Sequence, residues 1–216
     1  MSRKSIYFAG SVVILALLGG CSSAYYKTME GLGIEKRDIL IDRVEDARDA
    51  QDSASEQFAS ALDQFRSVVN FDGGDLEETY DRLSTEYDNS ASEASDVSKR
   101  IDAVEDVATD LFKEWELELD QYSRAELRKT SADLLRDTRK RYATLMASMR
   151  RAESSMEPVL AAFQDQVLFL KHNLNARAIG ALRSELDSIE RDTATLIAQM
   201  QKAIAEANAF IESMQA

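Results

Sequence analysis

Residues 127–170 read LRKTSADLLRDTRKRYATLMASMRRAESSMEPVLAAFQDQVLFL, and this stretch decides the fold. Its mostly apolar positions recur in steps of three and four residues, which places them on one side of an α-helix. They are Leu127, Ser131, Leu134, Thr138, Tyr142, Leu145, Met149, Ala152, Met156, Val159, Phe163, Val167 and Leu170. No stretch of the sequence shows the sustained alternation that is typical of a strand. The sequence therefore predicts an all-α protein.

Three further stripes with the same spacing cover residues 40–68, 76–115 and 179–214. Such a stripe faces one partner surface along a helix, and several helices of this kind cover one another in a bundle. We expect an elongated antiparallel up-down bundle of about four long helices with coiled-coil-like packing. Residues 34–216 should form it as a single domain, since the stripes follow one another with only short interruptions.

Capping residues mark two of the interruptions. The stretch Phe71-Asp72-Gly73-Gly74-Asp75 breaks the pattern with two glycines, and Asp75-Leu76-Glu77-Glu78 resembles a capping box with Asp75 as the N-cap. Ser123 and Glu126 resemble a second capping box. We therefore expect helices to begin just after Asp75 and just after Ser123.

The boundary between the third and fourth helices has two candidate positions. His172-Asn173-Leu174-Asn175 is a soft break, with an asparagine available as a cap. Pro158 lies inside the third stripe, where it should kink the helix or begin a new one. If the break at 172–175 is absent, three or more unequal helices bent at Pro158 would replace the four.

Charge predicts which helices are neighbours. Residues 72–120 contain 17 acidic and 4 basic side chains, whereas residues 124–151 contain 9 basic and 3 acidic ones. Joined by a tight turn at 122–123, these two helices would lie antiparallel with complementary flanks. Single exposed ion pairs contribute only about 0.2–1 kcal/mol, so their role would be register rather than bulk stability.

The first 20 residues are typical of an export signal and are kept apart from the fold. Their apolar stretch, residues 6–18, would reach about 20 Å as a helix, short of the roughly 30 Å hydrocarbon core. The run Leu18-Gly19-Gly20-Cys21 then resembles the lipobox of bacterial lipoproteins. The resemblance implies cleavage between Gly20 and Cys21 and a lipid on the Cys21 thiol. A plain secretory signal with a chance cysteine is the alternative.

The same resemblance implies a location in the bacterial cell envelope. In Gram-negative lipoproteins an Asp after the cysteine favours inner-membrane retention, so Ser22 points to the outer membrane, with the body facing the periplasm. Residues 21–33 would be a short tether that follows the lipid. Without residues 1–20 the chain has 24 basic and 39 acidic side chains, a charge of −15. A body this acidic is repelled by an anionic membrane surface, so we expect it to stand off from the bilayer.

Composition excludes several kinds of site. The single cysteine and single histidine cannot build a cysteine zinc site or a multi-histidine metal centre. The acidic excess, 39 against 26 basic side chains, argues against nucleic acid as the main partner. His172 lies between Lys171 and Asn173 at a helix end, where capping is a commoner role than catalysis. We therefore expect no catalytic residue, no metal and no cofactor.

Two acidic clusters and the aromatic residues have ordinary structural explanations. The cluster at 72–78 lacks the spacing of a calcium loop, and capping explains two of its carboxylates. The cluster at 42–52 lacks the Glu-x-x-His motifs that carboxylate-bridged metals in bundles draw on, which favours a solvated face. The second cluster contains Asp42, Glu45, Asp46, Asp49 and Asp52. The aromatic residues expected in the core are Tyr80, Tyr87, Trp115, Tyr142 and Phe163.

Particular stretches resemble a family of uncharacterised bacterial proteins, catalogued as domain of unknown function 2959. They are Gly33-Ile34-Glu35-Lys36-Arg37-Asp38-Ile39-Leu40, Asp42-Arg43-Val44-Glu45-Asp46-Ala47-Arg48, Val69-Asn70-Phe71-Asp72-Gly73-Gly74, Arg100-Ile101-Asp102-Ala103-Val104-Glu105-Asp106-Val107 and Leu170-Lys171-His172-Asn173-Leu174-Asn175-Ala176-Arg177-Ala178. The resemblance covers essentially the whole mature chain. It implies a secreted helical domain in Gram-negative bacteria and supplies no activity.

Three functions remain open at this point. The first is a lipid-anchored, non-enzymatic scaffold, spacer or adaptor that binds a protein partner or itself. The second is a helical binding module for an apolar ligand, lipid or partner helix, favoured if the small or polar stripe positions cluster at one level. These positions are Gln51, Ala54, Ser90, Ser131, Thr138 and Thr193. The third is an enzyme, for which His172, Asp72 and Asp75 would be the candidate residues.

Overall fold

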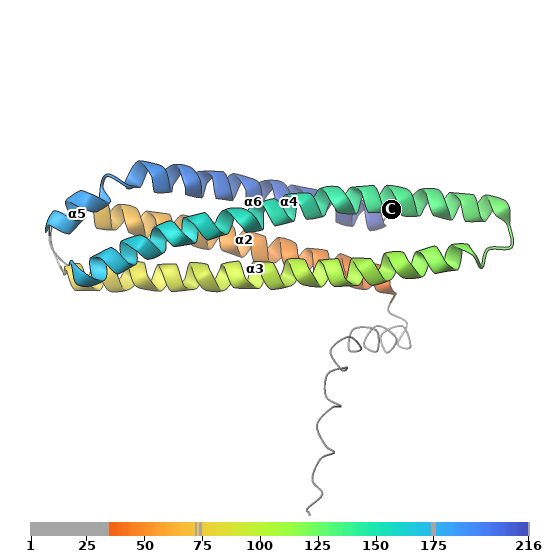
Figure 1. The fold of residues 1–216 in the computed structure, drawn as a ribbon, viewed down its shortest axis with the longest axis horizontal. Helices are drawn as coiled ribbons and strands as arrows, with labels where there is room; N and C mark the ends of the chain where they lie inside the picture. The colour runs from red at the N-terminus through yellow and green to blue at the C-terminus, as the bar shows by residue number, and fades with distance from the viewer. Residues whose placement is uncertain (1–34, 72, 74, 174–175, 216) are drawn as a thin grey trace, which may run out of the picture.

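The computed structural model describes residues 35–71, 73, 75–173 and 176–215, and within them it contains helices and no strands. Four helices are long and one is short. They are α2 (Lys36–Val69), α3 (Leu76–Leu119), α4 (Ala125–His172), α5 (Ala176–Leu182) and α6 (Leu186–Gln215). The predicted all-α bundle of about four long helices is confirmed (Figure 1).

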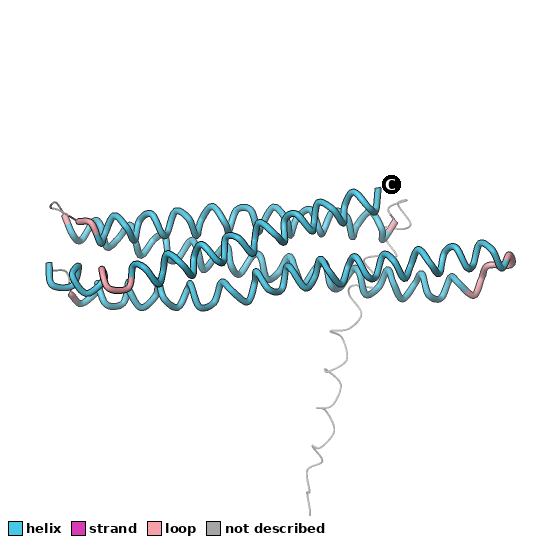
Figure 2. Tube along the Cα trace, turned by 90° about the horizontal axis from the view of Figure 1, so that it is seen from above, coloured by secondary structure: helices cyan, strands magenta, loops and turns pink. Residues whose placement is uncertain are grey.

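The long helices form a ring in which each packs mainly against two neighbours. α3 lies between α2 and α4, and α6 closes the ring by packing against both α4 and α2. Successive long helices run antiparallel, as Figures 1 and 2 show. The short α5 connects α4 to α6 and contacts α2 and α4. The predicted pairing of the acidic α3 with the basic α4 is therefore confirmed.

The two predicted caps have different outcomes. Asp75 is the N-cap of α3, and its Oδ1 accepts hydrogen bonds from the backbone N–H groups of Glu77 (2.9 Å) and Glu78 (3.2 Å). The prediction for Ser123 is wrong, because Arg124 is the N-cap of α4 and no side chain caps that end. All residues from 120 to 130 are exposed, so water can satisfy the free N–H groups there.

The third and fourth long helices separate at the soft break and not at Pro158. α4 is one helix of 48 residues that continues through Pro158 to His172. Pro158 lies on the exposed side, where the carbonyl group that loses its intrahelical donor can meet water. A second interruption was not predicted: residues 183–185 separate α5 from α6 although the stripe continues across them. There the Arg183 guanidinium donates to the backbone oxygen of Val69 (3.1 Å), at the last residue of α2.

Most positions of the predicted stripes form the core. Phe58, Phe65 and Phe163 are fully buried, and the rings of Phe65 and Phe163 pack edge to face with centroids 6.3 Å apart. Gln51, a polar member of the first stripe, is also fully buried, and neither its amide nitrogen nor its amide oxygen has a hydrogen-bond partner. Such a group costs about 1–3 kcal/mol relative to a satisfied one.

One end of the bundle contains only two helices. α2 begins beside α3 at the Lys36–Glu114 ion pair (2.9 Å), and α6 ends just after Phe210 packs on Tyr142. Beyond these points α3 and α4 continue alone, as the turn at the right of Figure 1 shows. We call residues 116–136 the overhang; its α4 part extends for about 18 Å.

Candidate functional site

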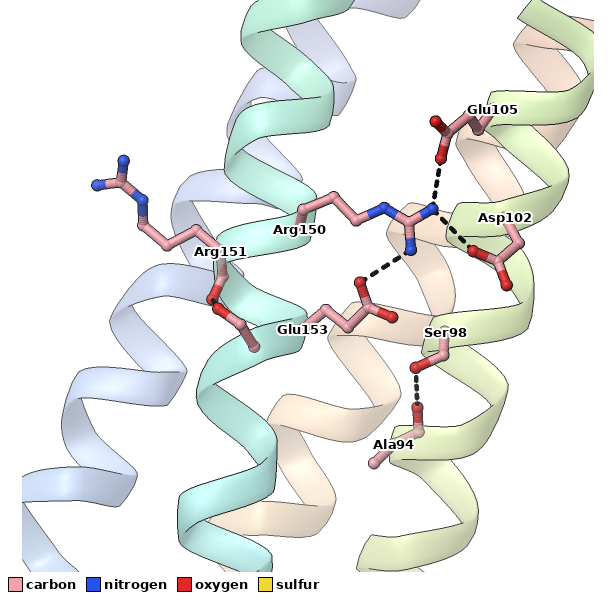
Figure 3. Close-up of polar contacts among 8 residues, drawn as sticks. Ala94, Ser98, Asp102, Glu105, Arg150, Arg151 and Glu153 are labelled. Carbon is pink, nitrogen blue, oxygen red and sulfur yellow. Dashed lines mark hydrogen bonds and ion pairs between the residues drawn. The ribbon is translucent and has the colours of Figure 1, made fainter.

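On the contact line between α3 and α4, Arg150 forms ion pairs with more carboxylates than any other basic side chain in the described part of the chain. Arg150 of α4 reaches across to α3, where its Nη2 contacts Asp102 Oδ1 at 2.7 Å and Glu105 Oε2 at 2.5 Å (Figure 3). Its Nη1 contacts Glu153 on the next turn of α4 at 3.0 Å. The neighbouring Arg151 points away from this line. One guanidinium therefore serves three carboxylates.

The carboxylates decide the charge state of Arg150. Burial alone would lower the pKa of its guanidinium, but the hydrogen bonds to Glu105, Asp102 and Glu153 outweigh that effect and raise the pKa. The guanidinium stays charged at every physiological pH, and three acids already engage it. The cluster is suited to holding the register of α3 against α4, not to proton transfer.

A second group of contacts lies nearer the overhang. Arg139 forms an ion pair with Glu116 and lies over the Phe112 ring, 5.3 Å from its centroid. The hydrogen bond from Arg139 lowers the pKa of Glu116. Phe112 also packs edge to face against Tyr142, with ring centroids 5.3 Å apart. Aromatic packing and charge thus hold the two helices together where α2 and α6 end.

Tyr142 should show a pH dependence of its own. Burial, together with the charge of Glu105, raises the pKa of its phenol to about 12. A raised pKa means that the neutral phenol is favoured in the folded protein, so its contribution to stability is complete below about pH 10 and is lost as pH rises through 12. We expect the difference in 295 nm absorbance between wild type and Tyr142→Phe, recorded just after a pH jump, to have its midpoint near pH 12. A midpoint near pH 10, the value expected in urea, would contradict this burial.

An open groove of about 630 Å³ lies beside the Arg150 cluster, between α3 and α4. Small side chains line much of it, including Ala91, Ser95 and Ser98 on α3 and Ser154 and Ala161 on α4. Ser98 is already engaged, since its hydroxyl donates to the backbone oxygen of Ala94 (3.2 Å; Figure 3). The groove is open and its lining includes Glu153 and Glu157, so it fits a helix surface better than a small anion.

Two of the three residues singled out as candidate catalytic groups lie at helix ends, and the third lies outside the described residues. His172 is the exposed last residue of α4, and Asp75 caps α3, whereas Asp72 lies outside the described residues. Gly20, Cys21 and the tether also lie outside them. In the acidic cluster, Asp46 accepts from Arg43 (3.0 Å) and Arg100 (3.3 Å), as expected for a solvated, ion-paired face.

The small and polar stripe positions do not share one level of the bundle. Side-chain contacts of α2 with α3 and α6 fix the relative levels of these helices. Gln51 and Ser90 lie at nearly the same level, but Thr193 lies about 18 Å farther along. Ser131 is in the overhang, where its hydroxyl accepts from Trp115 Nε1 (2.8 Å). The arrangement therefore offers no continuous polar layer for a ligand.

Sequence reasoning missed three features of this region. The triple pairing of Arg150 and the missing partners of Gln51 depend on register, which a stripe alone does not specify. The exposure of Leu127 and Leu134, 48% and 56%, depends on where α2 and α6 end. A comparison of helix lengths is the signal that could have found it: the second and third stripes are longer than the first and fourth.

A family model matches most of the chain. Residues 25–214 match the family described as Protein of unknown function (DUF2959). The chain belongs to this family. The family match begins ten residues before the first residue of the described bundle, Glu35, and covers all of its helices nearly to the end. No curated protein matches the chain. Within the described part of this family member, no helix is both long and apolar enough to cross a membrane, and no three metal-binding side chains converge.

Proposed function

We propose that the protein is a lipid-anchored, non-enzymatic scaffold or spacer of the bacterial cell envelope. Its anchor would be the lipid on Cys21, in the outer membrane, and its body would face the periplasm. The observation that carries the proposal is the continuous α4, 48 residues and about 72 Å long, which packs along most of its length against α3 and α6. A braced rod keeps its two ends a fixed distance apart.

The start of α2 supports this orientation. Lys36 lies beside Glu114, at the end of the bundle that carries the overhang. A tether that ends there would hold Lys36 near the bilayer, while the far end of the bundle with α5 would lie about 50 Å from Lys36, the length of α2. The charge of −15 on the mature chain favours a body that stands off from anionic lipid.

Metabolic labelling tests the anchor. We expect radiolabelled palmitate to label the wild-type protein in cells, and intact-mass spectrometry to show an acylated chain that starts at Cys21. Cys21→Ser should lose the label completely, whereas the neighbouring Ser22→Ala should keep it. Equal labelling of wild type and Cys21→Ser would refute the anchor. An unlabelled wild type cleaved elsewhere would support a plain secretory signal.

A binding module for a partner helix is the second candidate, and the groove between α3 and α4 is the observation that favours it. Small side chains such as Ala91 and Ala161 allow close approach of another helix. A recurrent envelope protein crosslinked from the groove would favour this function over a passive spacer. An apolar ligand retained by the purified protein in native mass spectrometry would extend the function to small molecules.

A further inference from the structure

The stripe that forms the core of α4 continues past the end of the bundle. Leu145, Met149 and Ala152 are at most 1% exposed, because α6 and its neighbours cover them. Leu127 and Leu134 lie on the same stripe, 18 and 11 residues before Leu145, and are 48% and 56% exposed. The overhang thus presents a core-type surface on which no described helix packs.

Exposed apolar side chains are concentrated in the same place. Of the six large hydrophobic residues that stand out as exposed in the described part of the chain, four belong to the overhang. They are Leu117, Tyr122, Leu127 and Leu134. The other two, Leu168 and Phe169, lie near the opposite end of α4. A cluster of this kind on an otherwise charged protein indicates an interaction surface.

The geometry of the ring restricts what can cover this surface. The exposed side of the overhang lies in line with the ends of α2 and α6. A helix that approached this side from the bundle body, parallel to α2 and α6, would therefore collide with their ends. A covering helix pair must come from beyond the turn and run in the opposite direction. The overhang of a second copy meets this requirement, because it is itself a helix pair of the same length with the same stripe. We propose that two copies pair end to end through their overhangs and complete a four-helix segment between the two bundles.

Charge and area are compatible with such a pair. Residues 116–136 contain five acidic and four basic side chains, a net charge of −1, so that two overhangs repel each other little although each mature chain carries −15. A face about 18 Å long and two helices wide buries roughly 1,000 Å² in total, near the lower limit for a specific interface. The pair should be weak in solution. Anchoring on one membrane, which is the function proposed above, raises the effective concentration and would favour it.

A bilayer is a poorer occupant than a second copy. Leu134 lies about 13 Å from the start of α4, whereas an interfacial segment enters a bilayer by only about 5–10 Å. Insertion of the turn would therefore leave Leu134 in water. Lateral packing of two overhangs covers both Leu127 and Leu134.

Photocrosslinking of the full chain in cells tests the pair. We expect a photoreactive phenylalanine analogue at Leu134 to give a product of twice the mass, with crosslinked peptides that map to residues 116–136 of a second copy. The same analogue at Leu168 is the matched control, because that leucine is 51% exposed on the same helix, about 50 Å away. Leu127→Glu should lower the yield from Leu134 about tenfold, since a buried unpaired charge costs more than 1.4 kcal/mol.

The outcomes separate this inference from the proposed anchor. Products of Leu134 with lipid or with another protein would overturn the pairing, and so would equal self-crosslinking from Leu168 or no product from either site. Palmitate labelling is read independently in the same cells. Self-crosslinking without palmitate supports the pair and refutes the anchor, whereas palmitate without self-crosslinking does the reverse.

Discussion

Replacing Phe163 by alanine should lower the free energy of unfolding by about 3–5 kcal/mol. Phe163 is fully buried, and its ring meets Phe65 of α2 edge to face, across the bundle from α4. The substitution leaves a cavity between helices that do not otherwise pack closely, and it also removes an aromatic pair worth about 0.5–1.5 kcal/mol. Urea unfolding followed by circular dichroism measures the change, and the midpoint of thermal unfolding should fall by roughly 10 °C.

Phe169 provides the matched control for this substitution. It is the same residue type on the same helix, but its side chain is 40% exposed. We expect Phe169→Ala to change stability by less than about 1 kcal/mol, as surface substitutions do. Similar losses from Phe163→Ala and Phe169→Ala would mean that the four-helix core does not close at this level.

Replacing Gln51 by leucine should raise the free energy of unfolding by about 1–3 kcal/mol. Gln51 is fully buried in α2, and both polar atoms of its amide lack partners. Leucine has a similar volume and needs no hydrogen bonds, so the penalty of the buried amide disappears. The buried residues at this level of the neighbouring helices include Ala94 and Ala203, which leave room for a branched side chain.

Gln57 is the control, because its amide nitrogen donates to the side chain of Glu86 on α3 at 2.6 Å. Gln57→Leu breaks this link between two helices and should cost about 1 kcal/mol. Urea unfolding of the two variants should therefore move in opposite directions. If Gln51→Leu is the destabilised one, the amide has a bound partner in solution, and the interior should be searched for a ligand.

The fold was predictable because each long stripe repeats its spacing many times. The balance of charge also identified α3 and α4 as neighbours, since 17 acidic residues face a helix with 9 basic ones. Which carboxylate meets which guanidinium was not predictable: Arg150 reaches both Asp102 and Glu105 only in the register that packing of the stripes selects. The same register decides that Gln51 is buried without a partner.

Helix starts and breaks were predictable only where a side chain of the same segment caps the helix. Asp75 caps α3 through its own carboxylate, so its position in the sequence was informative. Ser123 had the same motif, but α4 begins one residue later on an exposed turn where water serves the free N–H groups. The interruption at 183–185 contains neither glycine nor proline, and it depends on the distant contact of Arg183 with the end of α2. The sequence around residues 183–185 does not predict this long-range contact.

The ring of helices also has a consequence for the order of folding. Three of its four principal contacts join successive long helices, and such local pairs form quickly because little entropy is lost in closing the short connections between them. The fourth joins α2 to α6, which more than 100 residues separate. Ring closure must wait until the last helix has been made. Until then the apolar side of α2 that faces α6 is exposed to solvent. We therefore expect chaperones to bind the unfinished chain.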